Sequence, residues 1–113
     1  MKYSIYQIPF QTTPEEEKEY VRYSFAHLDW IDEVKLSRYK KVYEGVIGEG
    51  NPNEKLEDLF RMFNLNHPED FKGHSLSVSD LIKLDNKFYY CDAFGWTNIK
   101  FNKFGIYVVR KNK

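Results

Sequence analysis

The centre of the chain reads Gly73-His74-Ser75-Leu76-Ser77-Val78-Ser79-Asp80-Leu81-Ile82 and, after five intervening residues, Phe88-Tyr89-Tyr90-Cys91-Asp92-Ala93-Phe94-Gly95-Trp96. Apolar and aromatic runs near 80–84 and 87–92 flank Asp85-Asn86-Lys87, in which Asn86 tolerates a positive φ. This pattern predicts two antiparallel strands joined by a tight hairpin. The serines recur at every second position, so an extended segment would place their hydroxyls on one face.

Outside this centre, three more stretches have a strand-like pattern: 3–8, 40–47 and 105–109. The clearest helix is predicted at 54–63, where Asn53 can act as the cap. One face of that helix is apolar, with residues at helical spacing: Leu56, Leu59, Phe60 and Phe63. Further helices are predicted to begin at Thr13-Pro14-Glu15-Glu16 and to span 26–34. We therefore expect one α+β domain: an antiparallel β-sheet with two or three helices packed on one face.

Aromatic residues are unusually frequent for a chain of 113 residues: they make up 18%, with nine Tyr, nine Phe and two Trp. One interpretation is an aromatic core with half-buried strands, because aromatic side chains bury large areas and favour sheets. The other is a surface that carries aromatic anchors for a partner. If they are exposed, four residues are the expected anchors: Trp30, Tyr39, Tyr43 and Trp96.

The charges balance, with 17 basic and 17 acidic residues and a formal net charge of +0. This balance argues against a dedicated duplex-DNA binder and against an acidic mimic of DNA, both of which depend on a large excess of one sign. The distribution is uneven, because five basic residues and no acidic one follow Asp92. That basic end is either a solvated tail or a contact for an anionic partner.

Few residues have the spacing of a metal-binding or catalytic motif. The three histidines show no metal-ligand spacing, and Cys91, the single cysteine, has no cationic neighbour and is predicted to be a small core residue. A hydrolytic site could be assembled from His74, Ser77, Asp80 and Asp92, yet no nucleophile motif surrounds the serines. The structural alternative is that these side chains bond the backbone of turns. We predict no metal, no cofactor and no catalytic residue.

Two observations bear on location. No apolar run approaches the ~18 residues that a membrane span requires, and Met1-Lys2 leads into a strand-like pattern instead of the apolar core of a signal peptide. One cysteine excludes an internal disulfide and fits a reducing compartment. The expected location is the cytoplasm, with no membrane contact.

Several segments carry a resemblance to a known family: Tyr3-Ser4-Ile5-Tyr6-Gln7-Ile8, Tyr43-Glu44-Gly45, Leu59-Phe60-Arg61-Met62-Phe63-Asn64, His67-Pro68-Glu69-Asp70-Phe71-Lys72-Gly73-His74-Ser75-Leu76-Ser77-Val78-Ser79-Asp80 and Tyr89-Tyr90-Cys91-Asp92-Ala93-Phe94-Gly95-Trp96. With these segments the chain resembles the YodL-like family. The block that ends at Asp80 is the specific part. The resemblance covers residues 1–101, which leaves 102–113 as a basic C-terminal extension.

YodL-like proteins occur in bacteria as small standalone proteins and as modules in large polyvalent proteins of phages and conjugative elements. The resemblance implies a small module that acts by contacting other macromolecules, and it transfers no active site.

The expected function is therefore a non-enzymatic protein-interaction module that modulates or inhibits a host bacterial protein. Antagonism of a defence system, including a CRISPR nuclease, fits that setting. The candidate partner-binding residues are Trp30, Tyr39, Tyr43, His74, Ser77, Asp80, Asp92 and Trp96. Two alternatives stay open: a nucleic-acid-binding module that uses the basic C-terminal segment, and a small hydrolase.

Overall fold

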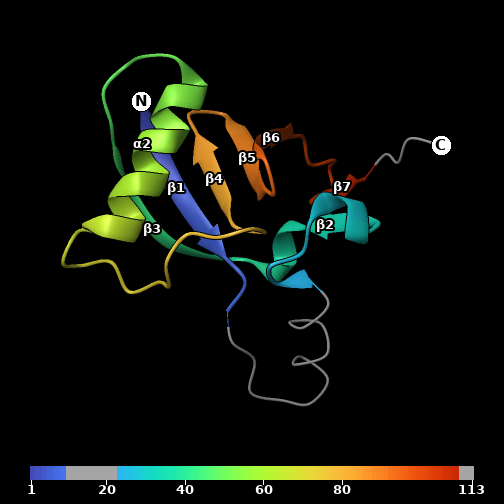
Figure 1. Cartoon of the computed structure of the whole chain (residues 1–113). Helices are drawn as coiled ribbons and strands as arrows, with labels where there is room; N and C mark the ends of the chain where they lie inside the picture. The colour runs from blue at the N-terminus through green and yellow to red at the C-terminus, as the bar shows by residue number, and fades with distance from the viewer. Residues whose placement is uncertain (10–22, 110–113) are drawn as a thin grey trace.

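The computed structural model describes residues 1–9 and 23–109 of the chain. Within these residues the main element is an antiparallel sheet of five strands in the order β3-β1-β4-β5-β6 (Figure 1). Its strands are β1 (Lys2–Gln7), β3 (Lys40–Val46), β4 (Leu81–Leu84), β5 (Lys87–Asp92) and β6 (Gly95–Ile99). A smaller sheet pairs β2 (Glu33–Lys35) with β7 (Ile106–Val108). Two 3₁₀ turns, η1 (Leu28–Trp30) and η2 (Leu36–Arg38), flank β2.

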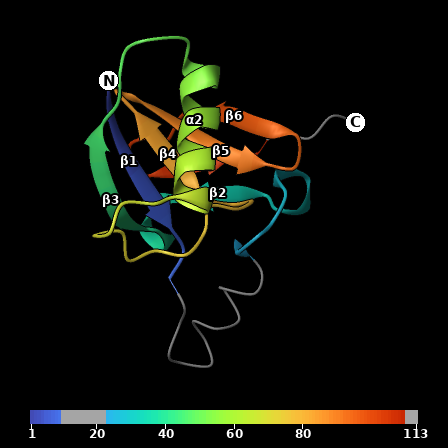
Figure 2. The ribbon, with the colours of Figure 1, turned by 60° about the vertical axis from the view of Figure 1, so that its left-hand side comes forward.

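One α-helix, α2 (Pro52–Leu65), crosses a face of the five-stranded sheet (Figure 2). The predicted apolar face is confirmed for Leu56, Leu59 and Phe63, which are buried. Each such burial contributes about 1.5–3 kcal/mol. The helix begins earlier than predicted because the side chain of Asn51, not Asn53, caps it and accepts a hydrogen bond from the Asn53 N–H at 2.9 Å. Pro52 then occupies the first helical turn, where its missing N–H costs nothing.

The α+β prediction with an antiparallel sheet is confirmed, but the expectation of two or three helices is wrong for the part of the chain that the structure describes. There, α2 is the only α-helix. Residues 26–34, predicted to be helical, instead contain η1 and the start of β2, because Glu33 and Val34 pair with Val108 and Tyr107. The helix start predicted at Thr13-Pro14-Glu15-Glu16 lies outside the described residues.

The two faces of the large sheet support two cores. The core under α2 is rich in aromatic rings, with Phe63 edge-on to Tyr3, Tyr43 and Phe71. The second core lies on the opposite face around Leu81, Tyr90 and Ile99. Two segments cover it, one with η1 and β2 and the other with β7. Tyr107 and Val109 pack there, so residues of the 102–113 extension complete the fold.

The predicted hairpin is confirmed: β4 and β5 pair from Leu84 opposite Lys87 through Leu81 opposite Tyr90. The residue with positive φ is Asp85, at 52°, whereas the prediction gave this role to Asn86. No strand was predicted for β6, which follows the turn Ala93-Phe94-Gly95. The turn ends at Gly95, whose φ is 130°, and Trp96 already pairs with Cys91.

Candidate functional site

The serine-rich segment does not form the strand that its spacing allowed. Residues 73–80 run as an irregular loop into β4, and Ser79 has a φ of 85°. Ser79 holds this unusual conformation with three hydrogen bonds. Its N–H donates to the Cys91 carbonyl at 2.9 Å, its carbonyl accepts from the Tyr39 hydroxyl at 2.5 Å, and its hydroxyl oxygen accepts from the Phe25 N–H at 2.8 Å.

Gln7, at the end of β1, fastens this loop to the sheet. Its side-chain N–H groups donate to the His74 carbonyl at 2.8 Å and to Asp80 Oδ2 at 3.0 Å, and its Oε1 accepts from the His74 N–H at 3.1 Å. Both amide hydrogens of Gln7 are therefore used. The His74 Nδ1 lies 2.8 Å from the Ser75 carbonyl, which can only accept, so this nitrogen carries a hydrogen.

Asp80 lies at the centre of the cluster and is 1% exposed. Its Oδ2 accepts from Gln7 and also from the Ser77 N–H, at 3.0 Å each. Burial raises the pKa of the Asp80 carboxyl to about 7, although His74, the Ser77 N–H and the Gln7 amide favour its charged form. A buried carboxyl with a raised pKa is a common feature of active sites, but it also occurs in structural networks.

The structure thus brings together three of the four residues considered for hydrolysis: His74, Ser77 and Asp80. Their contacts go mainly to backbone groups and to Gln7. His74 Nδ1 donates to the Ser75 carbonyl, and the Ser77 hydroxyl is buried with no hydrogen-bond partner among the described residues. A serine nucleophile requires a base within hydrogen-bond distance of its oxygen. The arrangement is suited to fixing the loop conformation.

Asp92 belongs to a different cluster, at the end of β5. Its Oδ1 accepts from the Ala93 N–H at 2.9 Å and the Leu28 N–H at 3.3 Å, and it lies 3.6 Å from His27 Nδ1. The His27 ring packs edge-on against the Trp30 ring, with centroids 4.1 Å apart. Asp92 therefore connects the β5–β6 turn to η1.

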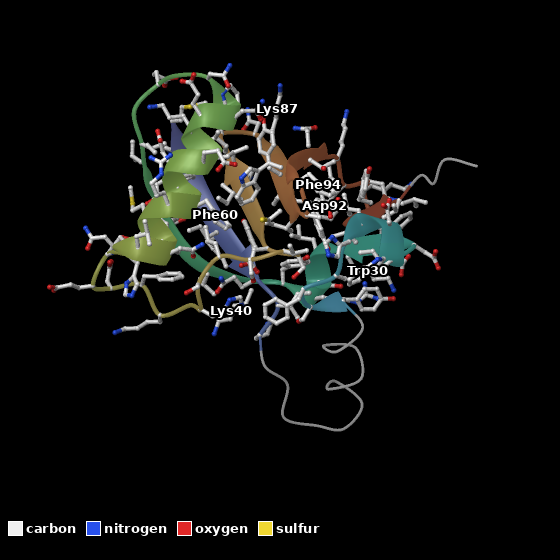
Figure 3. The ribbon with its side chains drawn as sticks, in the orientation of Figure 1. Trp30, Lys40, Phe60, Lys87, Asp92 and Phe94 are labelled. Carbon is white, nitrogen blue, oxygen red and sulfur yellow. The ribbon has the colours of Figure 1, made fainter. Side chains whose placement is uncertain are left out.

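Two large apolar side chains extend from these connected turns. Trp30, in η1, is 70% exposed, and Phe94, in the β5–β6 turn, is fully exposed. Figure 3 shows Trp30, Asp92 and Phe94 on the same side of the molecule. We call Trp30, His27, Asp92 and Phe94 the aromatic surface.

The other predicted anchors take part in packing. The Tyr39 hydroxyl bonds to Ser79, and burial raises its pKa well above the usual value. Tyr43 packs against Phe63 and Phe71, and its hydroxyl donates to Asp70 at 3.0 Å. Trp96 is half-buried against Phe60.

A model of the YodL-like domain matches residues 2–101. The chain belongs to the YodL-like family. No curated protein and no solved structure matches it. The YodL-like match ends before β7, so the chain closes its second core with a strand from outside the matched region.

The remaining candidate sites in this YodL-like domain are a reactive cysteine and a metal site. Cys91 is buried, and burial raises the pKa of its thiol to about 12, so the thiol is protonated at neutral pH. Among the described residues, no three His, Cys, Asp or Glu side chains are grouped so as to hold a metal ion. No helix in the described part of the chain is long and apolar enough to cross a membrane.

Three residues at these clusters were missed at the sequence level: Gln7, His27 and Phe94. Gln7 ends a strand and contacts residues that follow it by 67 and 73 positions, so no local pattern marks it. Phe94 lies inside the turn Ala93-Phe94-Gly95, and a large apolar residue in a turn is a signal of surface exposure that the sequence did contain.

Proposed function

We propose that this YodL-like protein is a non-enzymatic interaction module that binds a bacterial protein through the aromatic surface. In the setting of phages and mobile elements, such a module would modulate or inhibit a host protein, with a defence nuclease as one suitable target. The observation that carries this proposal is the exposure of Trp30 and Phe94 on two turns that the Asp92–His27 contact joins.

The energetic argument is that binding energy at interfaces concentrates in a few aromatic residues. A specific complex needs about 800 Å² from each partner. Trp30 and Phe94 can supply the centre of such an area, because both side chains are largely exposed and both lie on anchored turns.

The polar cluster of Gln7, His74, Ser77 and Asp80 supports the same proposal, because it has a structural role. Gln7 and Asp80 form their hydrogen bonds with each other and with the 74–80 loop. Within that loop, Ser79 forms hydrogen bonds with Tyr39 and Phe25. In this arrangement the buried polar residues act as a scaffold, and the exposed surface is the functional part.

The test compares the double variant Trp30→Ala/Phe94→Ala with the wild type. The tagged proteins are used to capture partners from a bacterial host lysate, and the affinity for any captured protein is then measured with purified components. We expect the double variant to bind the same protein at least ~30-fold more weakly, which corresponds to about 2 kcal/mol. Its melting temperature should stay close to that of the wild type, because both rings are exposed.

The matched control is Leu65→Ala, which removes another highly exposed apolar side chain, at the end of α2. It should bind as the wild type does. The proposal fails if the double variant keeps its affinity, if Leu65→Ala loses as much, or if the wild type retains no protein.

A second candidate function is the binding of single-stranded nucleic acid near the basic C-terminal end. It is favoured by Phe104, which is 74% exposed and has the Lys103 ammonium 5.2 Å from its ring centroid. Exposed rings beside cations are stacking positions for bases.

For this second function we expect a labelled oligonucleotide to bind with an affinity that falls steeply between 50 and 200 mM salt. The variant Lys103→Ala/Phe104→Ala should bind at least ~10-fold more weakly, measured by fluorescence anisotropy. Point variants are preferable to deletion of the extension, because β7 pairs with β2. Binding that is absent, or unchanged in the variant, removes this candidate.

A further inference from the structure

A pocket of about 560 Å³ lies where the end of β1, the start of β3 and the loop that contains Gly73 meet. Small-molecule sites commonly have volumes of ~300–1,000 Å³, so this pocket is large enough for a compact metabolite. Part of its lining is apolar, from Ile8, Pro9 and Val42. The remainder includes three lysines: Lys40, Lys41 and Lys72.

The three lysines are not neutralised equally. Lys41 pairs with Glu44 at 3.0 Å, whereas Lys40 and Lys72 form no ion pair with any described residue. Asp70, the acidic residue nearest to Lys72 in the sequence, accepts a hydrogen bond from the Tyr43 hydroxyl and is not part of the lining. The pocket therefore has an excess of about two positive charges. Lys40 projects from the lower part of the molecule in Figure 3.

A β-bulge shapes this end of β3. Ile5 pairs with Tyr43 and Tyr6 pairs with Lys41, so Val42 is an extra residue without a partner across the strands. Bulges bend a strand and redirect its side chains. This explains how three consecutive residues, 40–42, can line one pocket although neighbours in a regular strand point to opposite faces.

The opposite wall is rigid. Gly73 and His74 form it together with Gln7, whose amide bonds both the N–H and the carbonyl of His74. A side chain at position 73 would collide with the Gln7 oxygen and with the Phe71 ring, so this wall depends on glycine. A wall fixed in advance lowers the cost of ordering a site when a ligand binds.

We propose that this pocket binds a small phosphate monoester, with the phosphate held by Lys40 and Lys72 and the organic part against Ile8 and Val42. The charge favours this ligand, because a monoester carries about −1.5 to −2 at pH 7. It therefore matches two ammonium groups that have no ion pair among the described residues better than a single carboxylate does. Lysine also suits it chemically, since its ammonium group binds phosphate as a point charge.

The proposal is tested by NMR titration of the full chain with adenosine monophosphate, ribose 5-phosphate and inorganic phosphate, at constant ionic strength set with sodium chloride. We expect the two esters to shift the backbone amide signals of residues 40–42 and 72–74. Inorganic phosphate should shift the same signals with at least ~5-fold weaker affinity, because it does not reach the apolar wall.

The variant Lys40→Ala/Lys72→Ala should weaken ester binding at least ~10-fold. Its matched control is Lys87→Ala/Lys100→Ala, which removes the same charge from a different pocket and should bind as the wild type does. Circular dichroism verifies that both variants are folded. The proposal is overturned if the esters shift no signals, if both double variants weaken binding equally, or if inorganic phosphate binds as tightly as the esters.

Discussion

The variant Gln7→Leu is expected to lower the free energy of unfolding by about 3–6 kcal/mol, which is a large part of the total for a domain of this size. Leucine has nearly the same volume as glutamine, so the apolar packing around position 7 is preserved. The change removes three hydrogen bonds at once: those to the His74 carbonyl and to Asp80 Oδ2, and the one from the His74 N–H.

The magnitude follows from what remains in the protein after the substitution. Leaving a buried polar group without a partner costs about 1–3 kcal/mol for each group, and more when the group is charged. Asp80 is 1% exposed and accepts hydrogen bonds from Gln7 and from the Ser77 N–H. The substitution removes the first of these and leaves the second. The loss should therefore exceed that of an ordinary surface substitution by several-fold.

Urea unfolding at pH 7, followed by tryptophan fluorescence, measures this effect. The control is Tyr43→Phe, which also deletes a side-chain hydrogen bond, to Asp70, but at the exposed surface. Its expected cost is about 0.5 kcal/mol or less. A Gln7→Leu protein that unfolds within about 1 kcal/mol of the wild type would show that this cluster does not hold the loop.

The second large effect concerns the pH dependence of stability through Asp80. The pKa of an aspartate is about 3.9 in an unfolded chain, and burial raises the pKa of Asp80 to about 7 in the folded protein. Between these values the folded state binds more protons than the unfolded state does. The Asp80 contribution to the free energy of unfolding must then fall as the pH rises from about 4 to about 7, and it levels off above that range.

The variant Asp80→Asn cannot ionise and keeps an oxygen that can accept from Gln7 and Ser77. Relative to the wild type, it should therefore gain stability as the pH rises from 5 to 8. The gain is on the order of a few kcal/mol, since each unit of pKa shift corresponds to about 1.4 kcal/mol. Urea unfolding of both proteins at pH 5, 6, 7 and 8 measures the difference directly, because titrating groups that do not interact with Asp80 contribute equally to both.

Asp85→Asn is the matched control, because Asp85 also accepts a backbone N–H, from Lys2 at 3.0 Å, but is exposed. It should show no comparable gain at high pH. A difference between Asp80→Asn and the wild type that stays constant from pH 5 to 8 would mean that the Asp80 carboxyl is ionised throughout this range.

Local patterns in the sequence were sufficient for the elements whose contacts are local. Asp85-Asn86 specified the β4–β5 hairpin, because a two-residue loop fixes the pairing of the strands on either side. The apolar spacing of Leu56, Leu59 and Phe63 specified the buried face of α2 before any contact was known. The short family block that ends at Asp80 was likewise sufficient to indicate the YodL-like domain.

Patterns failed where a distant partner decides the structure. Residues 26–34 have a helix-like composition, yet Val34 forms a strand because Tyr107, far along the chain, offers an edge to pair with. The spacing of Ser75, Ser77 and Ser79 allowed a strand, but Gln7, Tyr39 and Cys91 stabilise a loop there instead.

The sequence by itself therefore determined the fold class, the hairpin, the helix and the family, since each is indicated by patterns within short stretches of the chain. Only the tertiary structure decided which of the four predicted anchors are exposed. The Trp30 ring faces solvent, whereas the Tyr39 hydroxyl reaches Ser79. The physical reason is that burial depends on which elements pack over a residue, and those elements come from other parts of the chain.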